Sequence, residues 1–241
     1  MTASLYDSPA WRGVFQDPDL SPLFTDTAEL RATLLVMGTL ALTQAKAGVV
    51  PDVSAQAIQR ASMEVQIDPA ALSQMIRETG DPVLAIIAQF KSEMQAPEHA
   101  KWIHHDSDTA LTAATALSLR LRQALKHIGA RLSLDADTIP TAQLSAFHAV
   151  PAMQTGLAQG LGLADGTAKT PHAMICTLAA WATETTQQID GATQAGTAIK
   201  HQMPLLNTMI QTAPNDAPSL IASMTLPQMM LGLATLSSPR T

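Results

Sequence analysis

The sequence predicts an all-α protein built as a helical bundle. Hydrophobic residues make up 46% of its 241 residues, but aromatic residues make up only 3%. Aliphatic residues and methionine therefore supply the apolar surface, and this composition favours helices over strands. A chain of this length can bury one sizeable core or two small ones. We expect a single domain over 1–241, with an N-terminal helical region (1–105), long bundle helices (106–200) and a short helical tail (201–241).

Helix starts are marked by an acidic or hydroxyl residue followed by proline. The side-chain oxygen can accept a hydrogen bond from a free amide of the first turn, and proline suits the first helical position. Asp26 and Glu29 resemble a capping box, which predicts a helix to about Lys46 that Gly48 and Pro51 end. Shorter helices are expected from Pro51 to Met94. The pairs with proline are Asp17-Pro18, Asp68-Pro69, Asp81-Pro82 and Thr170-Pro171.

The clearest long helix is expected to begin in the polar run 106–109 and to continue to about Leu132. Apolar residues recur every three or four positions along it, which gives one apolar face suited to a bundle. Arg120, Arg122, Lys126 and Arg131 lie mostly off that face. The apolar face consists of Leu111, Ala114, Leu117, Leu121, Leu125, Ile128 and Leu132.

The remaining chain predicts a connection over 133–140, a helical stretch over 141–162 interrupted near Pro151, and a helix from Pro171 to about Ala195. Ile175, Leu178, either Trp181 or Ala182, and Ile189 have helical spacing in the last of these. After Pro204, prolines at 214, 218 and 227 predict only short helices.

Several protein classes are excluded by composition. Cys176 is the only cysteine, which excludes an internal disulfide framework and, without a basic neighbour, favours a small apolar role over a nucleophile. The longest apolar stretches fall short of a membrane span, and no segment has a basic start followed by an apolar run and a small-residue cleavage site, so a cytoplasmic protein is expected. A net charge of −6 without a basic cluster argues against nucleic acid as a partner. No cofactor-binding motif is found.

Three stretches resemble the 3-carboxy-cis,cis-muconate cycloisomerase branch of the fumarase/aspartase superfamily. The opening nine residues, MTASLYDSP, are similar to the N-terminus of that family. The run WIHHDSDT at 102–109 and the helix TALSLRLR at 115–122 resemble the family's W-V-H-W-G-A-T-S-Q-D and T-A-L-V-L-R-L-R. The fragments LGL at 161–163, PHA at 171–173 and AW at 180–181 resemble the family's L-G-L, W-H-A and G-W.

The resemblance implies an L-aspartase/fumarase fold, a homotetramer with active sites drawn from three subunits, and a soluble enzyme of the β-ketoadipate pathway without a cofactor. The family reaction lactonises a muconate-type tricarboxylate: one carboxylate adds across a double bond and the adjacent carbon is protonated. The family's central T-R-M-Q-like segment should follow Leu132, where only a short polar connection stands. The chain is therefore expected to be shortened, with part of the central helical region missing.

Candidate site residues follow from the same resemblance. His104 and Thr109 match substrate-binding positions, whereas Asp108 places a carboxylate where the family has a neutral donor, which disfavours an anion. The family's flexible catalytic loop G-S-S-x-M-P-x-K-x-N aligns with 196–204. There Thr197 and His201 are the catalytic candidates and Lys200 the substrate-binding candidate, while Gly196 and Gln202 replace the family's serine base and lysine.

Two functions remain open. The chain is either a cycloisomerase-like enzyme acting on a small polycarboxylate or a non-catalytic helical oligomer or partner subunit of an intact relative. The long apolar stripes predict self-association in either case. His104, His105, Asp106 and Asp108 could ligate zinc, but their adjacency favours capping and loop roles, so no metal site is expected.

Overall fold

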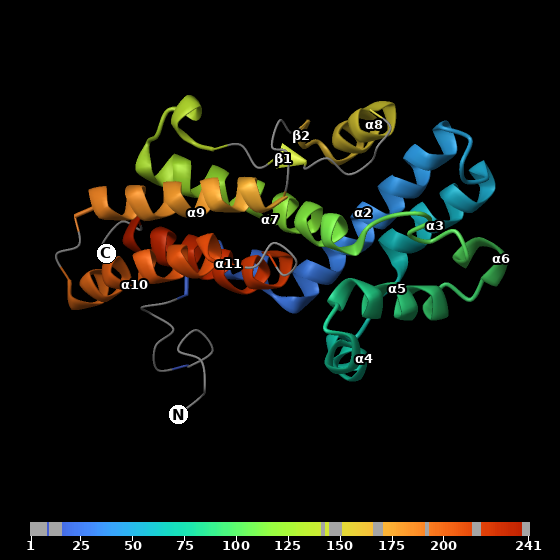
Figure 1. Ribbon diagram of the computed structural model, residues 1–241, viewed down its shortest axis with the longest axis horizontal. Coiled ribbons are helices and arrows are strands. Elements are labelled where there is room, and N and C mark those ends of the chain that lie inside the picture. Colours follow the sequence, from blue (N-terminus) through green and yellow to red (C-terminus); the bar gives the residue numbers. More distant parts are fainter. Residues whose placement is uncertain are drawn as a thin grey trace. The chain divides into compact units, whose positions relative to one another are not determined.

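The protein is helical, as predicted. The computed structural model describes residues 9, 16–140, 143–144, 151–165, 171–190, 193–213 and 218–237 (Figure 1). Two-residue strands β1 (Gln143–Leu144) and β2 (Ala164–Asp165) form a parallel pair. The helices are η1 (Ser21–Phe24), α2 (Asp26–Lys46), α3 (Asp52–Glu64), η2 (Pro69–Leu72), α4 (Ser73–Thr79), α5 (Pro82–Glu93), α6 (Pro97–Ala100), α7 (Thr109–Leu132), η3 (Ala136–Thr138), α8 (Pro151–Leu161), α9 (Pro171–Gln188), α10 (Gln194–Gln211) and α11 (Pro218–Ser237).

The chain packs into two compact units. One, which we call the discontinuous unit, takes the described residues within Met1–Thr25, Leu121–Thr141 and Thr170–Thr241. The other, which we call the α2 unit, takes Asp26–Arg120 and those within Ala142–Lys169. Helix α7 contributes its first half to the α2 unit and its second half to the discontinuous unit. The single domain expected from the sequence stays a prediction.

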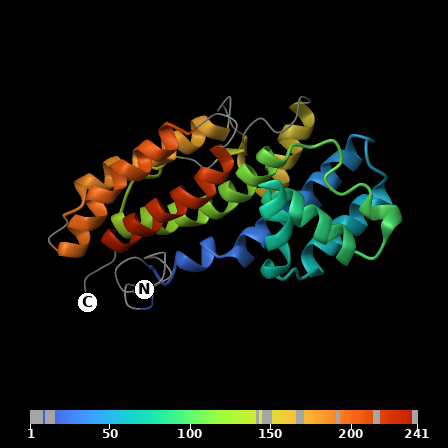
Figure 2. The ribbon, with the colours of Figure 1, turned by 60° about the horizontal axis from the view of Figure 1, so that its bottom comes forward.

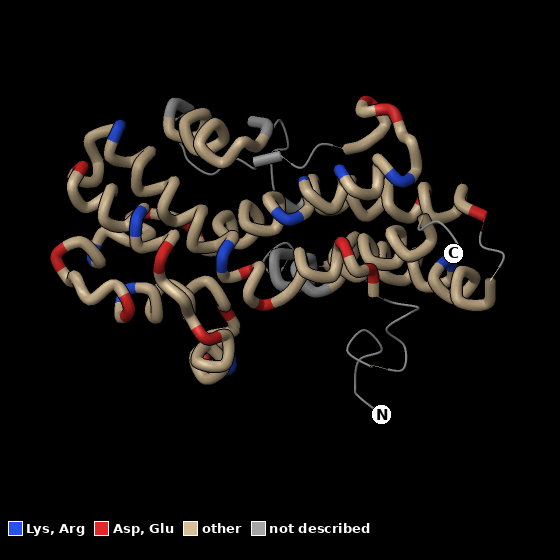
Figure 3. Tube along the Cα trace, turned by 180° about the vertical axis from the view of Figure 1, so that it is seen from behind, with Lys and Arg blue, Asp and Glu red and all other residues tan. Residues whose placement is uncertain are grey.

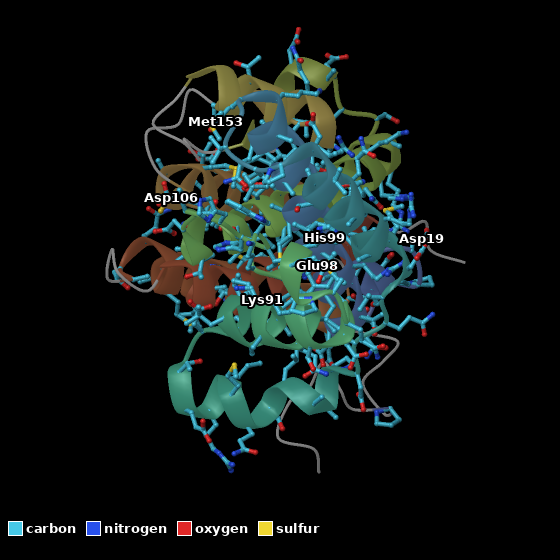
Figure 4. The ribbon with its side chains drawn as sticks, turned by 90° about the vertical axis from the view of Figure 1, so that its right-hand side faces the viewer. Asp19, Lys91, Glu98, His99, Asp106 and Met153 are labelled. Carbon is cyan, nitrogen blue, oxygen red and sulfur yellow. The ribbon has the colours of Figure 1, made fainter. Side chains whose placement is uncertain are left out.

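Helix α2 is the centre of its unit, because its buried residues lie on all sides of the helix. One side packs into a core with α3 and α5 that includes Phe90 and Ile58, and another packs against Leu157 and Leu161 of α8. Arg31 of α2 donates to the Met63 and Val65 carbonyls, which fixes the end of α3. A separate polar contact joins α6 to α3, where Ser54 Oγ lies 3.0 Å from His99 Nδ1 (Figure 4).

Three predicted caps of the α2 unit are confirmed. Asp68 accepts a hydrogen bond from the Ala70 amide at the start of η2. Asp81 accepts from the Val83 and Leu84 amides at the start of α5. Asp108 accepts from the Leu111 amide at the start of α7, within the predicted polar run. Glycine in the left-handed conformation follows α2 at Gly48, where the sequence predicted its end.

In the discontinuous unit, α9, α10 and α11 pack against one another in every pairing (Figures 1 and 2). The predicted helix over 171–195 is wrong in extent, because α9 ends at Gln188 and a new helix begins at Gln194, capped by Thr193. Ala182, rather than Trp181, is the buried member of its spacing.

The prediction of short helices after Pro204 is also wrong. Helix α10 continues through Pro204 to Gln211, and α11 runs for 20 residues through Pro227. Proline removes one amide donor, so the Lys200 carbonyl one turn before Pro204 loses its helical partner. The Gln187 side-chain amide of α9 donates to that carbonyl at 3.0 Å, which repairs the loss.

Asp17-Pro18 begins a turn and not a helix, which corrects the prediction for that pair. The Asp17 side chain accepts from the Asp19 and Leu20 amides and from Arg131 of α7. Arg131 thus binds the N-terminal segment. Arg120 was predicted to lie off the apolar face of α7, but this prediction is wrong. Arg120 is buried, with Nη1 3.8 Å from Glu29 Oε2 of α2. Arg122 and Lys126 are exposed, as predicted.

Charges are sparse along the helices (Figure 3). Helix α11 carries none, and Lys200 is the charged residue of α10. Even so, no helix among the described residues is both long enough and apolar enough to cross a membrane.

Candidate active site

The loop before α7 holds an unusual backbone in a fixed position. His104 and Asp106 have φ values of 57° and 46°, a left-handed conformation that non-glycine residues rarely adopt. The His105 carbonyl between them accepts a hydrogen bond from Gln44 Nε2 at 2.6 Å and another from Ser107 Oγ at 3.0 Å. The first bond attaches the loop to α2, and the second lies within the loop.

His104 contacts the first turn of α7 through Thr112. His104 Nε2 lies 2.8 Å from Thr112 Oγ1, and the Thr112 hydroxyl lies 3.0 Å from the Asp108 carbonyl. The Thr112 hydroxyl therefore lies within hydrogen-bond distance of both the imidazole and that carbonyl.

The pKa of His104 lies below its ordinary value. Burial is the main cause, and the Lys91 ammonium lowers it further, while Asp108 and Asp81 act in the opposite direction. A neutral imidazole is the form present at pH 7. His104 can therefore accept a proton but offers no positive charge to an anionic ligand.

Thr109, the first residue of α7, is already engaged. Its hydroxyl donates to Asp81 Oδ2 at 2.6 Å, which links the start of α7 to the start of α5. The charges around the start of α7 are mostly negative: Asp106 and Asp108 are exposed, Asp81 is half-buried, and Lys91 is the cation that acts on His104. Figure 4 labels Asp106 and Lys91. We call His104, Thr109, Thr112 and Asp81 the α7 cluster.

The segment aligned with the family's flexible loop is helical, contrary to expectation. Residues 196–204 lie inside α10, whose first turn is capped by Thr193 Oγ1 accepting from the Gly196 amide. Thr197 and His201 are exposed on that helix, and Gly196 is buried. A helical backbone satisfies its own hydrogen bonds, so these amides are not available to a ligand as loop amides would be.

Lys200 holds two helices together. Its ammonium donates to the Gln187 carbonyl in the last turn of α9 at 3.3 Å, while the Gln187 side chain donates to the Lys200 carbonyl. A cation at a helix C-terminus is favourable, because the final carbonyls lack amide partners. The lysine proposed to bind substrate thus has a structural partner within its own unit.

The structure therefore brings His104 and Thr109 into one cluster and Thr197, Lys200 and His201 onto one helix of the other unit. Sequence reasoning missed Asp81 as more than a helix cap, and it missed Thr112. Thr112 follows Asp108 by one helical turn, a spacing that could have pointed to it. Within the part of the chain that the structure describes, no three His, Cys, Asp or Glu side chains gather as metal ligands.

The sequence of the chain is similar to those of two known enzymes. No protein-family model matches the chain. The 3-carboxy-cis,cis-muconate cycloisomerase of Pseudomonas putida is 29% identical over 141 residues, which is 58% of this chain and 32% of the relative. The nitrosuccinate lyase of Streptomyces davaonensis is 29% identical over 124 residues, 51% of this chain and 26% of the relative. The chain is therefore similar in sequence to these two enzymes. Its matches span about a third or less of these relatives' length.

Solved structures share the superfamily fold. The Acinetobacter calcoaceticus β-carboxy-cis,cis-muconate cycloisomerase superposes with a TM-score of 0.74 at 15% identity, covering 94% of this chain and 75% of that one. The Pseudomonas putida lactonizing enzyme gives 0.74 at 16% identity, covering 95% and 74%. A fumarate lyase from Mesorhizobium sp. BNC1 gives 0.68 at 14% identity, covering 92% and 73%. The expected L-aspartase/fumarase fold is confirmed.

Acidification is expected to weaken the fold through His104. Its folded-state pKa is lowered, so its contribution to stability is fully present above about pH 6.5 and is lost as the pH falls toward the lower folded value. His104→Asn removes the titration, and asparagine tolerates the left-handed backbone. Urea unfolding at pH 7.5 and 5.5 should show a smaller acid loss in this variant than in the wild type. His127→Asn, on the exposed side of α7, is the control; an equal loss in H104N and wild type would contradict the assignment.

Proposed function

We propose that this chain is a divergent 3-carboxy-cis,cis-muconate cycloisomerase-like protein in which lactonisation of a muconate-type tricarboxylate is impaired. The observation that carries the proposal is the 29% identity over 141 residues to the Pseudomonas putida cycloisomerase. The α7 cluster, which lies where the resemblance places a substrate wall, agrees with it. We take the protein to act in the cytoplasm, in the degradation of aromatic compounds.

The reaction sets clear demands on a site. A substrate carboxylate oxygen forms a bond to an alkene carbon, negative charge collects on a second carboxylate, and a proton is delivered to the adjacent carbon. Such a site needs cations or hydrogen-bond donors around a trianion and one positioned proton donor. By resemblance to a family whose active sites draw on three subunits, His104, Thr109 and Lys200 are the proposed carboxylate-binding positions, and Thr197 and His201 are the proposed positions that handle the proton.

We propose that lactonisation is impaired because the candidate hydrogen-bond donors already donate to other groups of the protein, and because carboxylates near them repel an anionic substrate. The Thr109 proton is held by Asp81, the Lys200 ammonium by the Gln187 carbonyl, and Asp106 and Asp108 present carboxylates at the start of α7. Each lost charge-assisted hydrogen bond costs roughly 1.5–3 kcal/mol. Two such losses together slow a reaction by about a hundredfold or more.

The test is direct turnover of 3-carboxy-cis,cis-muconate, followed as loss of its ultraviolet absorbance. We expect a rate at least about a hundredfold below that of the Pseudomonas putida enzyme assayed alongside, and its abolition by Lys200→Ala. Thr208→Ala, at an exposed residue of α10 outside 196–204, is the control. A rate equal to the comparison enzyme would refute the impairment. A folded protein with neither turnover nor binding would refute the cycloisomerase proposal.

A second candidate is a non-catalytic helical homo-oligomer, a tetramer by resemblance, or a partner subunit of an intact relative. The observation that favours it is on α10, where Leu205 and Met209 are 67% and 54% exposed and lie one turn apart. An uncharged apolar stretch of this kind suits a protein contact. Light scattering of the assayed preparation decides the assembly: a monomer at all concentrations would contradict the homo-oligomer.

A further inference from the structure

Asp81 uses its two carboxylate oxygens for different purposes. Oδ1 accepts from the Val83 and Leu84 amides at 2.8 and 3.2 Å and so caps α5. Oδ2 accepts from the Thr109 hydroxyl at 2.6 Å, across 28 residues of chain. The cap needs one oxygen only, as Asp68 shows at the start of η2, where its Oδ1 accepts from the Ala70 amide. The second oxygen of Asp81 is therefore assigned to Thr109.

This hydrogen bond decides what Thr109 can offer to a ligand. A hydroxyl has one proton and two acceptor lone pairs. A donor–acceptor distance of 2.6 Å to a carboxylate is that of a strong, charge-assisted bond, so the Thr109 proton stays directed at Asp81. Thr109 consequently faces any ligand at the start of α7 with lone pairs, which repel a carboxylate and attract a donor.

We propose that Asp81 is a positioning residue that sets ligand preference at the α7 cluster, because it holds the Thr109 proton and turns this hydroxyl from a carboxylate donor into an acceptor. The location of the ligand at Thr109 rests on the proposed function. The effect of Asp81 does not require turnover, because it concerns only whether a polycarboxylate binds.

Asp81→Asn tests this with little change in shape. The asparagine Oδ1 retains the α5 cap, and its Nδ2 donates to Thr109 Oγ1, which frees the threonine proton for a ligand. The variant also removes one negative charge. We expect tricarballylate, a saturated tricarboxylate that cannot lactonise, to bind about tenfold tighter in calorimetric titrations of D81N than of the wild type.

Two controls distinguish the effect of the Thr109 hydroxyl direction on affinity from the effects of the lost negative charge and of a changed helix cap. Asp68→Asn makes the same change in an Asp-Pro cap that has no threonine partner among its hydrogen bonds, and its tricarballylate affinity should equal the wild type. The double variant D81N with Thr109→Val removes the hydroxyl, and most of the gain should disappear. Thr109→Val alone should leave affinity within about twofold, since the wild-type hydroxyl donates nothing to the ligand.

Histidine NMR supplies a reading that does not depend on the ligand. The Asp81 carboxylate raises the pKa of His104, against the larger lowering by burial, so D81N should lower that pKa further while the spectrum stays dispersed. A folded D81N with this change but no gain in affinity would overturn the proposal, and so would a gain that survives Thr109→Val. If D81N does not fold, a large loss of affinity in T109V alone would overturn it. Absence of turnover would count only against the proposed function.

Discussion

Replacing Arg131 by methionine is expected to destabilise the folded chain by about 3–5 kcal/mol, because it breaks a buried ion pair from one side. Arg131 Nη1 and Nη2 lie 2.5 and 3.1 Å from the two oxygens of Asp17, a bidentate geometry, and Nη2 lies 2.5 Å from Asp19 Oδ2. Asp17 is only 1% exposed. Methionine keeps the length of the stem but leaves a buried carboxylate without its cation. Urea unfolding at pH 7 measures the loss.

The pH dependence provides a second check on the same pair. Burial alone raises the pKa of Asp17, but hydrogen bonds from Arg131 and from the Leu20 and Asp19 amides outweigh it, so the folded pKa lies below the ordinary value. Its contribution is therefore present above about pH 3.9 and is lost as the pH falls through the lower folded pKa. In R131M burial should prevail, so the deficit should shrink in acid. Arg122→Met, an exposed arginine on the same helix, is the control; equal losses in both variants would rule out a special role for Arg131.

Gly160→Ala is expected to cost about 2–3 kcal/mol, because α8 approaches α2 too closely there for a methyl group. A Cβ at position 160 would lie 2.5 Å from Thr39 Cγ2, and a Cβ at Gly156 would lie 3.1 Å from Thr43 Cγ2. Threonine is β-branched and its rotamer is fixed here, since the Thr39 and Thr43 hydroxyls bond to carbonyls one turn earlier in α2. The helices must move apart instead. Thermal and urea unfolding measure the change.

A double-mutant cycle makes this expectation specific. Thr39→Ser removes Cγ2 and keeps the hydroxyl, so the pair G160A with T39S should recover most of the stability lost in G160A. Gly156→Ala is the graded comparison, with a smaller loss because its contact is longer. An additive result in the cycle, with no recovery, would show that the close approach is not the cause.

Features encoded by neighbouring residues could be predicted. Asp68-Pro69 and Asp81-Pro82 combine a capping oxygen with a preset φ, and both begin helices. The stripe from Leu111 to Leu132 repeats every three or four residues, and α7 spans it. Among the site residues, the sequence placed His104 and Thr109 beside the start of one helix, where they lie.

Features that depend on a partner far away in the sequence could not be predicted. Pro204 is a helix breaker by local rules, yet α10 continues because Gln187 of α9 supplies the missing donor. Asp17-Pro18 has the same local pattern as Asp81-Pro82, but its carboxylate accepts from an arginine 114 residues away. The sequence predicted Arg120 to lie off the apolar face, but in the structure it is buried near Glu29 of α2.

By itself, then, the sequence determined the helical class, most of the helix starts and the resemblance of the segment around His104 to a known family. These follow from bonds between residues within one or two turns of each other and from motifs read in order. Only the tertiary structure decided that the Thr109 hydroxyl donates to Asp81, that the Lys200 ammonium donates to the Gln187 carbonyl, and that the Asp17 carboxylate is buried. Hydrogen-bond direction and desolvation depend on which helices come into contact, and the contact between α5 and α7 in which Thr109 donates to Asp81 has no local signature.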